Sequence, residues 1–190
     1  TIQAQYFSEN TYSRDERLRY ILMKILLAEQ EIDLWEIEDE LFVSRTTLEL
    51  DIKSIKTLFL TFYPGIKLYR DNGKISAFGT EFSIRYLLSK LLLADYDSPR
   101  GVLLTPGAFY DRDRFYHILS RAAACLESRG VTMNDDSIAK LAAYLMVTES
   151  RIQSGKYVTV LEQDQEMPEQ SIAELAEYLF QTILTADAVS

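Results

Sequence analysis

A tight turn between two short β-type segments interrupts a chain that is otherwise patterned as helices. The turn is Asp71-Asn72-Gly73, and residues of alternating polarity flank it at 66–70 and 74–78. Asn and Gly tolerate the positive φ angles that two-residue hairpin turns need. We therefore predict a β-hairpin here, and this hairpin restricts the fold because of what precedes it.

Three helices are predicted before the hairpin, each from a polar cap followed by apolar residues at helical spacing. Their ranges are 14–28, 33–41 and 45–60. Ser13 with Glu16 forms a capping-box signature, and Asp33 with Glu36 has the same form. Ser44 is a good N-cap for the third helix. Three helices followed by a hairpin is the element order of a winged helix-turn-helix.

The remaining chain is also predicted to be helical, so the expected fold class is mainly α. Further helices are expected at 82–94, 110–129, 135–154 and 169–184, and 156–160 is a short β-prone stretch. Proline and glycine in 95–107 indicate a loop near a domain boundary. We predict a winged helix-turn-helix domain with a two-stranded wing at 12–80 and an α-helical bundle at 82–190.

The charge is unevenly distributed along the chain. Lys and Arg number 20 against 29 Asp and Glu, a formal net charge of −9, so any attraction for nucleic acid has to be local. Residues 45–74 hold six basic and three acidic side chains, whereas 29–40 hold seven acidic and no basic ones. One face of the first domain is therefore expected to be cationic and the other anionic.

Double-stranded DNA is the partner that this pattern predicts, with the helix after Ser44 entering the major groove and the hairpin lying along the phosphates. Opposite the apolar stripe of that helix lie polar and basic side chains. The residues predicted to contact DNA are Ser44, Arg45, Thr46, Thr47, Lys53, Lys56, Lys67, Arg70 and Lys74.

A second hypothesis is that the winged helix is a protein-interaction or dimerisation module that does not read DNA. Glu49 and Leu50 on the predicted recognition helix, together with the charge of −9, favour it. Light scattering and DNA binding of a Leu50→Arg variant separate the two hypotheses, which both stay open.

The sequence offers little for catalysis or metal binding. One Cys excludes an internal disulfide framework, and with a single His it leaves almost nothing for a zinc site. His117 is interpreted as an ordinary helical histidine, and Cys125, in an apolar helix segment, as a buried and inert thiol. No phosphate-binding loop or catalytic triad is present, so we expect no enzyme activity, cofactor or metal.

The segment Glu40-Leu41-Phe42-Val43-Ser44-Arg45-Thr46-Thr47-Leu48 resembles the helix-turn-helix signature of the Mga-type and BglG/MtlR-type bacterial regulators. Asp51 matches an Asp in the middle of the family's recognition helix. Gly79-Thr80-Glu81 and the following Arg85-Tyr86-Leu87-Leu88 resemble the family's segment after the wing. The resemblance implies a cytoplasmic transcription regulator that forms a homodimer.

The second half resembles a PTS regulation domain, a helical bundle that the sugar phosphotransferase system phosphorylates on histidines. Residues 141–151 align with the first histidine motif of that domain, but Tyr144 stands at the position of the phosphorylated His. The resemblance implies phosphotransferase proteins as possible partners. Because the chain begins at Thr1 and stops after a helical pattern, we expect an internal, truncated fragment of a longer intracellular protein, with no membrane span.

Overall fold

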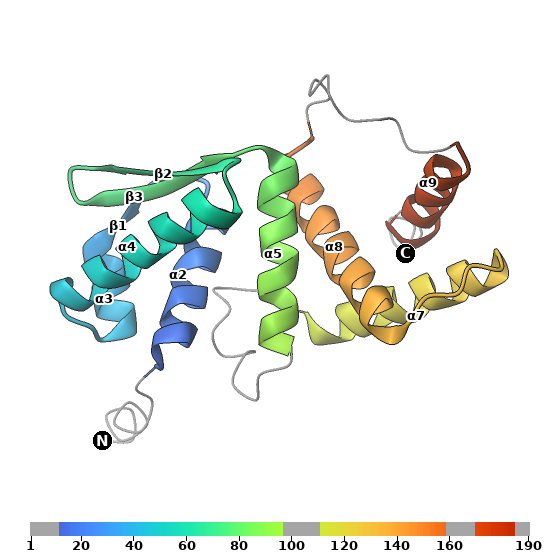
Figure 1. Cartoon of the computed structure of the whole chain (residues 1–190), viewed down its shortest axis with the longest axis horizontal. Coiled ribbons are helices and arrows are strands. Elements are labelled where there is room, and N and C mark those ends of the chain that lie inside the picture. The colour runs from blue at the N-terminus through green and yellow to red at the C-terminus, as the bar shows by residue number, and fades with distance from the viewer. Residues whose placement is uncertain (1–11, 97–110, 159–169, 185–190) are drawn as a thin grey trace.

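A computed structural model describes residues 12–96, 111–158 and 170–184, and within them it contains seven helices and three strands (Figure 1). The mainly α fold class is confirmed. The helices are α2 (Arg14–Leu27), α3 (Leu34–Leu41), α4 (Arg45–Phe62), α5 (Glu81–Tyr96), α7 (Arg112–Ser128), α8 (Asp135–Gln153) and α9 (Gln170–Leu184). The strands are β1 (Ile32–Asp33), β2 (Ile66–Asp71) and β3 (Lys74–Gly79). None of the helices in these ranges is both long and apolar enough to cross a bilayer.

The hairpin forms where the sequence places it. β2 and β3 pair antiparallel from Ile66 opposite Gly79 to Asp71 opposite Lys74. Asn72 and Gly73 have φ values of 45° and 81°, the positive angles of a two-residue hairpin turn. The wing is nevertheless not limited to two strands, because β1 pairs with β3 and gives the sheet the order β1-β3-β2. A strand of two residues is too short to leave a pattern in the sequence.

The helix starts are largely as predicted. The side chains of Ser13 and Glu16 both make their capping-box hydrogen bonds at the start of α2. Asp33 does precede α3, but its side chain makes no capping bond, which corrects the predicted cap. Asp33 lies in β1 instead, and the first amide of α3, that of Leu34, donates to the carbonyl of Gly73 at 2.9 Å. The hairpin therefore anchors the start of α3.

The recognition helix α4 is held against α2 by apolar contacts and by one buried ion pair. Leu48, Ile52 and Ile55 are buried, as their spacing predicts. Asp51 lies on the same side of α4 and is only 1% exposed. The Nε atom of Arg17 on α2 donates to its Oδ2 at 2.8 Å. Asp51 therefore fixes α4 on α2 rather than contributing to the exposed face.

The turn into α5 explains why the chain carries Gly79-Thr80-Glu81. A β-carbon on Gly79 would lie 2.6 Å from the carbonyl oxygen of Gly65, so only glycine fits there. The Thr80 hydroxyl then accepts a hydrogen bond from the amide of Ser83 at 3.2 Å, which caps α5. The predicted helix at 82–94 is longer than expected and runs to Tyr96.

Helix α5 stands between the winged helix on one side and α7, α8 and α9 on the other (Figure 1). The buried apolar residues of all these elements form one continuous cluster. Gly130 and Gly155 lie two residues after the last residues of α7 and α8, and they have positive φ as expected of helix-ending residues. Residues 156–158 form no strand, and the rest of the β-prone stretch and most of the predicted loop at 95–107 lie outside the described residues.

A buried ionic cluster joins the two sides of α5. Arg151 on α8 donates to both carboxylate oxygens of Glu81, at 2.8 and 2.7 Å, and to the carbonyl of Leu26 at 3.2 Å. Arg85 donates to Glu81 at 3.0 Å and to the carbonyl of Lys156 at 2.8 Å. Burial opposes the ionisation of Glu81, but the hydrogen bonds from Arg151 and Arg85 outweigh it and lower its pKa. The cluster thus connects α2, α5 and α8.

We predict that Asp51→Ala destabilises the protein by about 3 kcal/mol, because it leaves the Arg17 guanidinium without its partner in a mostly buried position. The free energy of unfolding in urea, followed by circular dichroism, measures the loss. Asp39→Ala, at an exposed position on α3, is the matched control. It should change the free energy of unfolding by less than about 0.5 kcal/mol. Equal effects of the two substitutions would contradict this role of Asp51.

A second prediction concerns pH. Because the pKa of Glu81 is lowered in the folded state, its contribution to stability is present above the ordinary value of 4.5 and is lost as the pH falls through the lower, folded value. Glu81→Gln should therefore be less stable than the parent at neutral pH, and the difference should shrink below pH 4.5. Urea midpoints over a pH series test this, with Glu29→Gln as the exposed control. A difference that is constant with pH would refute it.

Candidate nucleic-acid interface

The start of α4 is built by the cap that the sequence predicts. Ser44 has an extended backbone, and its Oγ accepts a hydrogen bond from the amide of Thr47 at 3.2 Å. The Oγ1 of Thr47 lies 3.0 Å from the same hydroxyl. Both hydroxyls are therefore engaged in the cap, although Ser44 is exposed at the surface.

The outward face of α4 is exposed and carries the mixed chemistry that major-groove contact needs. It is formed by Thr46, Leu50, Lys53 and Thr57. A shallow groove of about 660 Å³ runs between this face and α2. The hydroxyl and methyl groups of threonine, the ammonium of lysine and the apolar side chain of Leu50 can each contact base edges or phosphates.

The structure adds Arg14 to the predicted interface. Its side chain is 63% exposed, and its Nη2 donates to the Oγ of Ser54 on α4 at 2.7 Å. The guanidinium therefore lies on the α2 side of the groove, beside the outward face of the recognition helix. Arg14 cannot be predicted from the sequence, because 40 residues separate it from Ser54 and no local pattern brings the two together.

Glu49 occupies the side of α4 that faces the hairpin, where it binds two of the predicted DNA-contacting arginines. Both Nη atoms of Arg70 donate to its carboxylate, at 2.5 Å each. The Nε of Arg45 lies 3.2 Å from the same carboxylate, and Arg45 also pairs with Glu38 at 2.5 Å. The charges of Arg45 and Arg70 are therefore largely balanced within the protein.

The pairing also affects the protonation of both partners. The hydrogen bonds from Arg70 hold the pKa of Glu49 below its ordinary value, with the charge of Arg70 and then that of Arg45 acting in the same direction. The reciprocal hydrogen bond raises the pKa of Arg70. Glu49 consequently stays ionised at neutral pH and keeps Arg70 directed at α4.

The hairpin presents its basic residues on two opposite faces. Side chains alternate along a strand, so Arg70 shares with Ile66 the face that packs on α4. Lys67 and Lys74 lie on the other face, where Tyr69 and Phe78 are also exposed and their rings meet edge to face at 6.4 Å. Lys67, Arg70 and Lys74 therefore do not form a single basic stripe.

Four of the predicted basic residues are exposed and make no ion pair with any acidic residue in the described part of the chain. They are Lys53, Lys56, Lys67 and Lys74. The acidic segment 29–40 lies on β1, α3 and the turn before β1, and its Asp33 is directly opposite Lys74 in the sheet. Within it Glu40 pairs with Lys24, and the side chain of Trp35 is exposed. The predicted separation of charge is therefore incomplete. The four lysines are exposed and make no ion pair in the described residues, but Lys74 lies opposite Asp33 and Arg45 pairs with Glu38.

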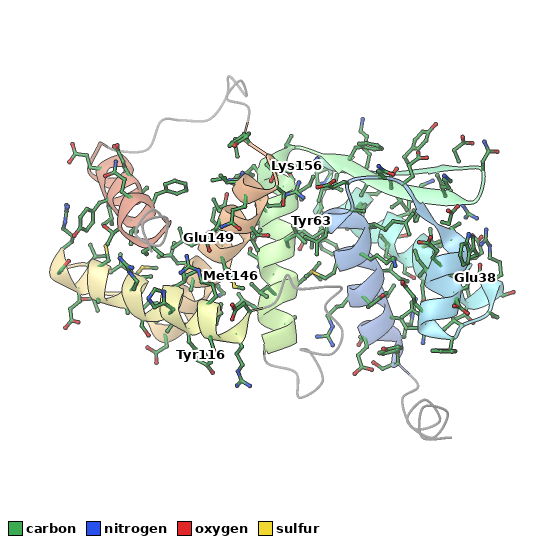
Figure 2. All side chains as sticks on the ribbon, turned by 180° about the vertical axis from the view of Figure 1, so that it is seen from behind. Glu38, Tyr63, Tyr116, Met146, Glu149 and Lys156 are labelled. Carbon is green, nitrogen blue, oxygen red and sulfur yellow. The ribbon has the colours of Figure 1, made fainter. Side chains whose placement is uncertain are left out.

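The remaining candidate residues lie on the other side of α5. Tyr144 is half-buried on α8, and burial raises the pKa of its hydroxyl, with a smaller opposing effect from Arg85. His117 is exposed on α7, where its Nδ1 lies 3.3 Å from Arg114. Arg114 itself pairs with Glu149 of α8, which is among the residues labelled in Figure 2. Cys125 is buried, as predicted, and burial raises the pKa of its thiol.

Comparison with known proteins gives two findings and one negative result. Residues 4–92 match the Mga helix-turn-helix domain family. Over 150 residues the chain is 23% identical to a protein of Bacillus subtilis (strain 168) described as "Probable licABCH operon regulator". That alignment covers 79% of this chain, which spans about a quarter, 23%, of the relative's length. No solved structure matches the chain. The segment that is similar to the Mga helix-turn-helix domain family thus includes the winged helix and most of α5.

Proposed function

We propose that this chain is part of a DNA-binding transcription regulator and that its winged helix contacts double-stranded DNA. The observation that carries the proposal is the exposed face of α4, flanked by lysines without acidic partners, on a protein whose net charge is −9. Exposed lysines that form no ion pair within the protein gain the most binding free energy when they contact phosphates. On a chain of net charge −9 they give the winged helix a local attraction for DNA.

In this arrangement α4 enters the major groove with Thr46 and Leu50 directed at the bases. Lys53 and Lys56 of α4, with Lys67 and Lys74 of the wing, contact the phosphate backbone beside it. If the four lysines each neutralise one phosphate, the logarithm of affinity falls with the logarithm of salt concentration at a slope of roughly −3 to −4. Arg45 and Arg70 contribute little while Glu49 holds them.

The comparisons support the same assignment. The matched family is described as a helix-turn-helix domain, and the similar Bacillus subtilis protein is described as an operon regulator. A helix-turn-helix and control of an operon are both consistent with transcription regulation through DNA. Because the chain spans only 23% of that relative, the activity of the whole protein is part of the proposal.

For the helices beyond α5 we propose a regulatory or dimerising role. The proposed links to the sugar phosphotransferase system and to a homodimer depend on the resemblance of 141–151 to a histidine motif, with Tyr144 at the place of the His. Tyrosine does not accept a phosphoryl group in a histidine relay, and His117 is the one histidine in the sequence. We therefore expect any response of this chain to phosphotransferase proteins to pass through binding rather than phosphorylation at Tyr144.

The lysines provide the direct test. We predict that Lys53→Ala and Lys67→Ala each weaken binding to a labelled duplex of mixed sequence and each reduce the salt slope by about one, because each removes one phosphate contact. Fluorescence anisotropy over a salt series measures both quantities. Lys140→Ala, on the far side of α5, is the matched control and should leave both unchanged.

The alternative, a protein-interaction module, predicts a different set of results. The exposed Leu50 on α4 favours it. If Leu50→Arg abolishes a dimer seen by light scattering while DNA affinity stays at the parent value, the interaction module is favoured. Absence of DNA binding by the parent at low salt, or equal losses in Lys53→Ala and Lys140→Ala, would refute the DNA proposal.

Glu49 yields a prediction of opposite sign. Glu49→Gln removes a negative charge from the proposed interface and releases Arg70, so DNA affinity should rise and the salt slope should steepen by about one. Glu29→Gln removes the same charge outside the interface and serves as the control. A fall in affinity for Glu49→Gln would show that the ion pair positions Arg70 for binding rather than withholding it.

A further inference from the structure

Helices α5 and α8 run side by side in opposite directions (Figure 1). Residues of both helices line a groove along part of their length. Their contact is tight where Arg151 meets Glu81, at the start of α5 and the end of α8. Toward the first half of α8 a groove of about 880 Å³ opens between them. This volume is within the range of roughly 300–1,000 Å³ typical of small-molecule sites. The described winged helix does not use it.

Two tyrosines, one from each helix, form the aromatic part of the groove. Tyr86 of α5 is 44% exposed, and Tyr144 of α8 is half-buried. The Nζ of Lys90 lies over the Tyr86 ring, 5.1 Å from its centre, so an ammonium group covers part of one ring face. Aromatic faces with polar groups at their edges suit a ligand that has both C–H surfaces and hydroxyl groups.

The polar groups of the groove are balanced in charge and mixed in hydrogen-bonding character. Asp136 is paired with Lys140, one turn further along α8. Lys90, a hydrogen-bond donor, and Asp135, a hydrogen-bond acceptor, also line the groove. Neither makes an ion pair in the described part of the chain. The Ser89 hydroxyl donates to the carbonyl of Tyr86 at 2.8 Å, which leaves its oxygen free to accept. Nothing in this set selects a strongly charged ligand.

We propose that the groove between α5 and α8 is a binding site for a small neutral polyhydroxylated molecule, of the sugar or polyol class. Each hydroxyl of such a ligand can accept from Lys90 and donate to Asp135 or Ser89. Its C–H faces pack against Tyr86 and Tyr144. An anionic ligand would be repelled by the carboxylates of Asp135 and Asp136, and a cationic ligand would be repelled by the ammonium groups of Lys90 and Lys140.

The position of the groove gives the ligand a route to the winged helix. Arg85 precedes Tyr86 on α5, and it bonds to Glu81 and to the chain just after α8. Arg151 of α8 in turn bonds to the end of α2 through the carbonyl of Leu26. A ligand that changes the packing of α5 on α8 therefore acts on the same cluster that holds α2. This consequence depends on the proposed DNA binding, whereas occupancy of the groove does not.

Saturation-transfer NMR on the full chain tests the site without DNA. D-glucose and sorbitol are the probes, each at millimolar concentration, and the expected result is saturation of their C–H protons. Tyr86→Ala should weaken binding by about tenfold through the loss of one aromatic wall. Tyr116→Ala is the matched control, because Tyr116 is 42% exposed and also lies beside a cation, Arg112, but outside the groove. It should leave binding unchanged.

A second variant, Asp135→Asn, guards against misfolding of Tyr86→Ala, since Asp135 is exposed and should affect only hydroxyl recognition. It should weaken binding of both probes. Absence of saturation transfer to glucose and sorbitol, or equal losses in Tyr86→Ala and Tyr116→Ala, would overturn the site. If glucose 6-phosphate bound while glucose did not, the neutral ligand class would be wrong. DNA is absent throughout, so failure here is distinct from failure of the DNA proposal.

Discussion

The ion pair between Asp51 and Arg17 determines how the recognition helix is presented. A carboxylate that is 1% exposed in the middle of α4 is stable only because a guanidinium from α2 reaches it, and the pair therefore sets the rotation of α4 about its own axis. That rotation places Leu48 and Ile52 inward and Leu50 and Lys53 outward. With the pair absent, the apolar contacts alone would tolerate a wider range of helix orientations.

The charge of the proposed interface depends on which of its basic residues already pair with acidic residues of the protein. Glu49 lies close enough to both Arg45 and Arg70 to balance them, so the strongest bidentate donors of the region are already in use. Lysines remain on the outward faces of helix and hairpin. Lysine attracts phosphate as a compact charge without the fixed fork of arginine, so such a surface favours general attraction over base-specific contact. In the proposed complex with DNA, Thr46 and Leu50 are the residues of this face left to discriminate between bases.

The sequence predicted those features that depend on neighbouring residues. Asn72-Gly73 fixed the hairpin turn, and Ser44 located the start of α4, because both act over three residues or fewer. The features that could not be predicted depend on contacts between residues that are far apart in the sequence. The Asp33 cap was wrong: Asp33 pairs with Lys74 in the sheet, its side chain makes no capping bond, and the amide of Leu34 donates to the distant carbonyl of Gly73. Arg14 and the Glu49–Arg70 pair were missed for the same reason, since 40 and 21 residues separate the partners. The predicted DNA contacts remain predictions.

The segment Gly79-Thr80-Glu81 shows how three adjacent residues can serve three separate constraints. Gly79 allows the end of the wing to pass close to Gly65, Thr80 caps α5, and Glu81 receives two arginines in the buried cluster. The same turn therefore ends the wing, begins α5 and connects it to α8. A displacement of α8 relative to α5 changes the environment of Glu81, and Glu81 is only two residues from the last residue of β3. The cluster is therefore connected to the winged helix in two ways, to the wing through the chain at Gly79 and to the end of α2 through the carbonyl of Leu26.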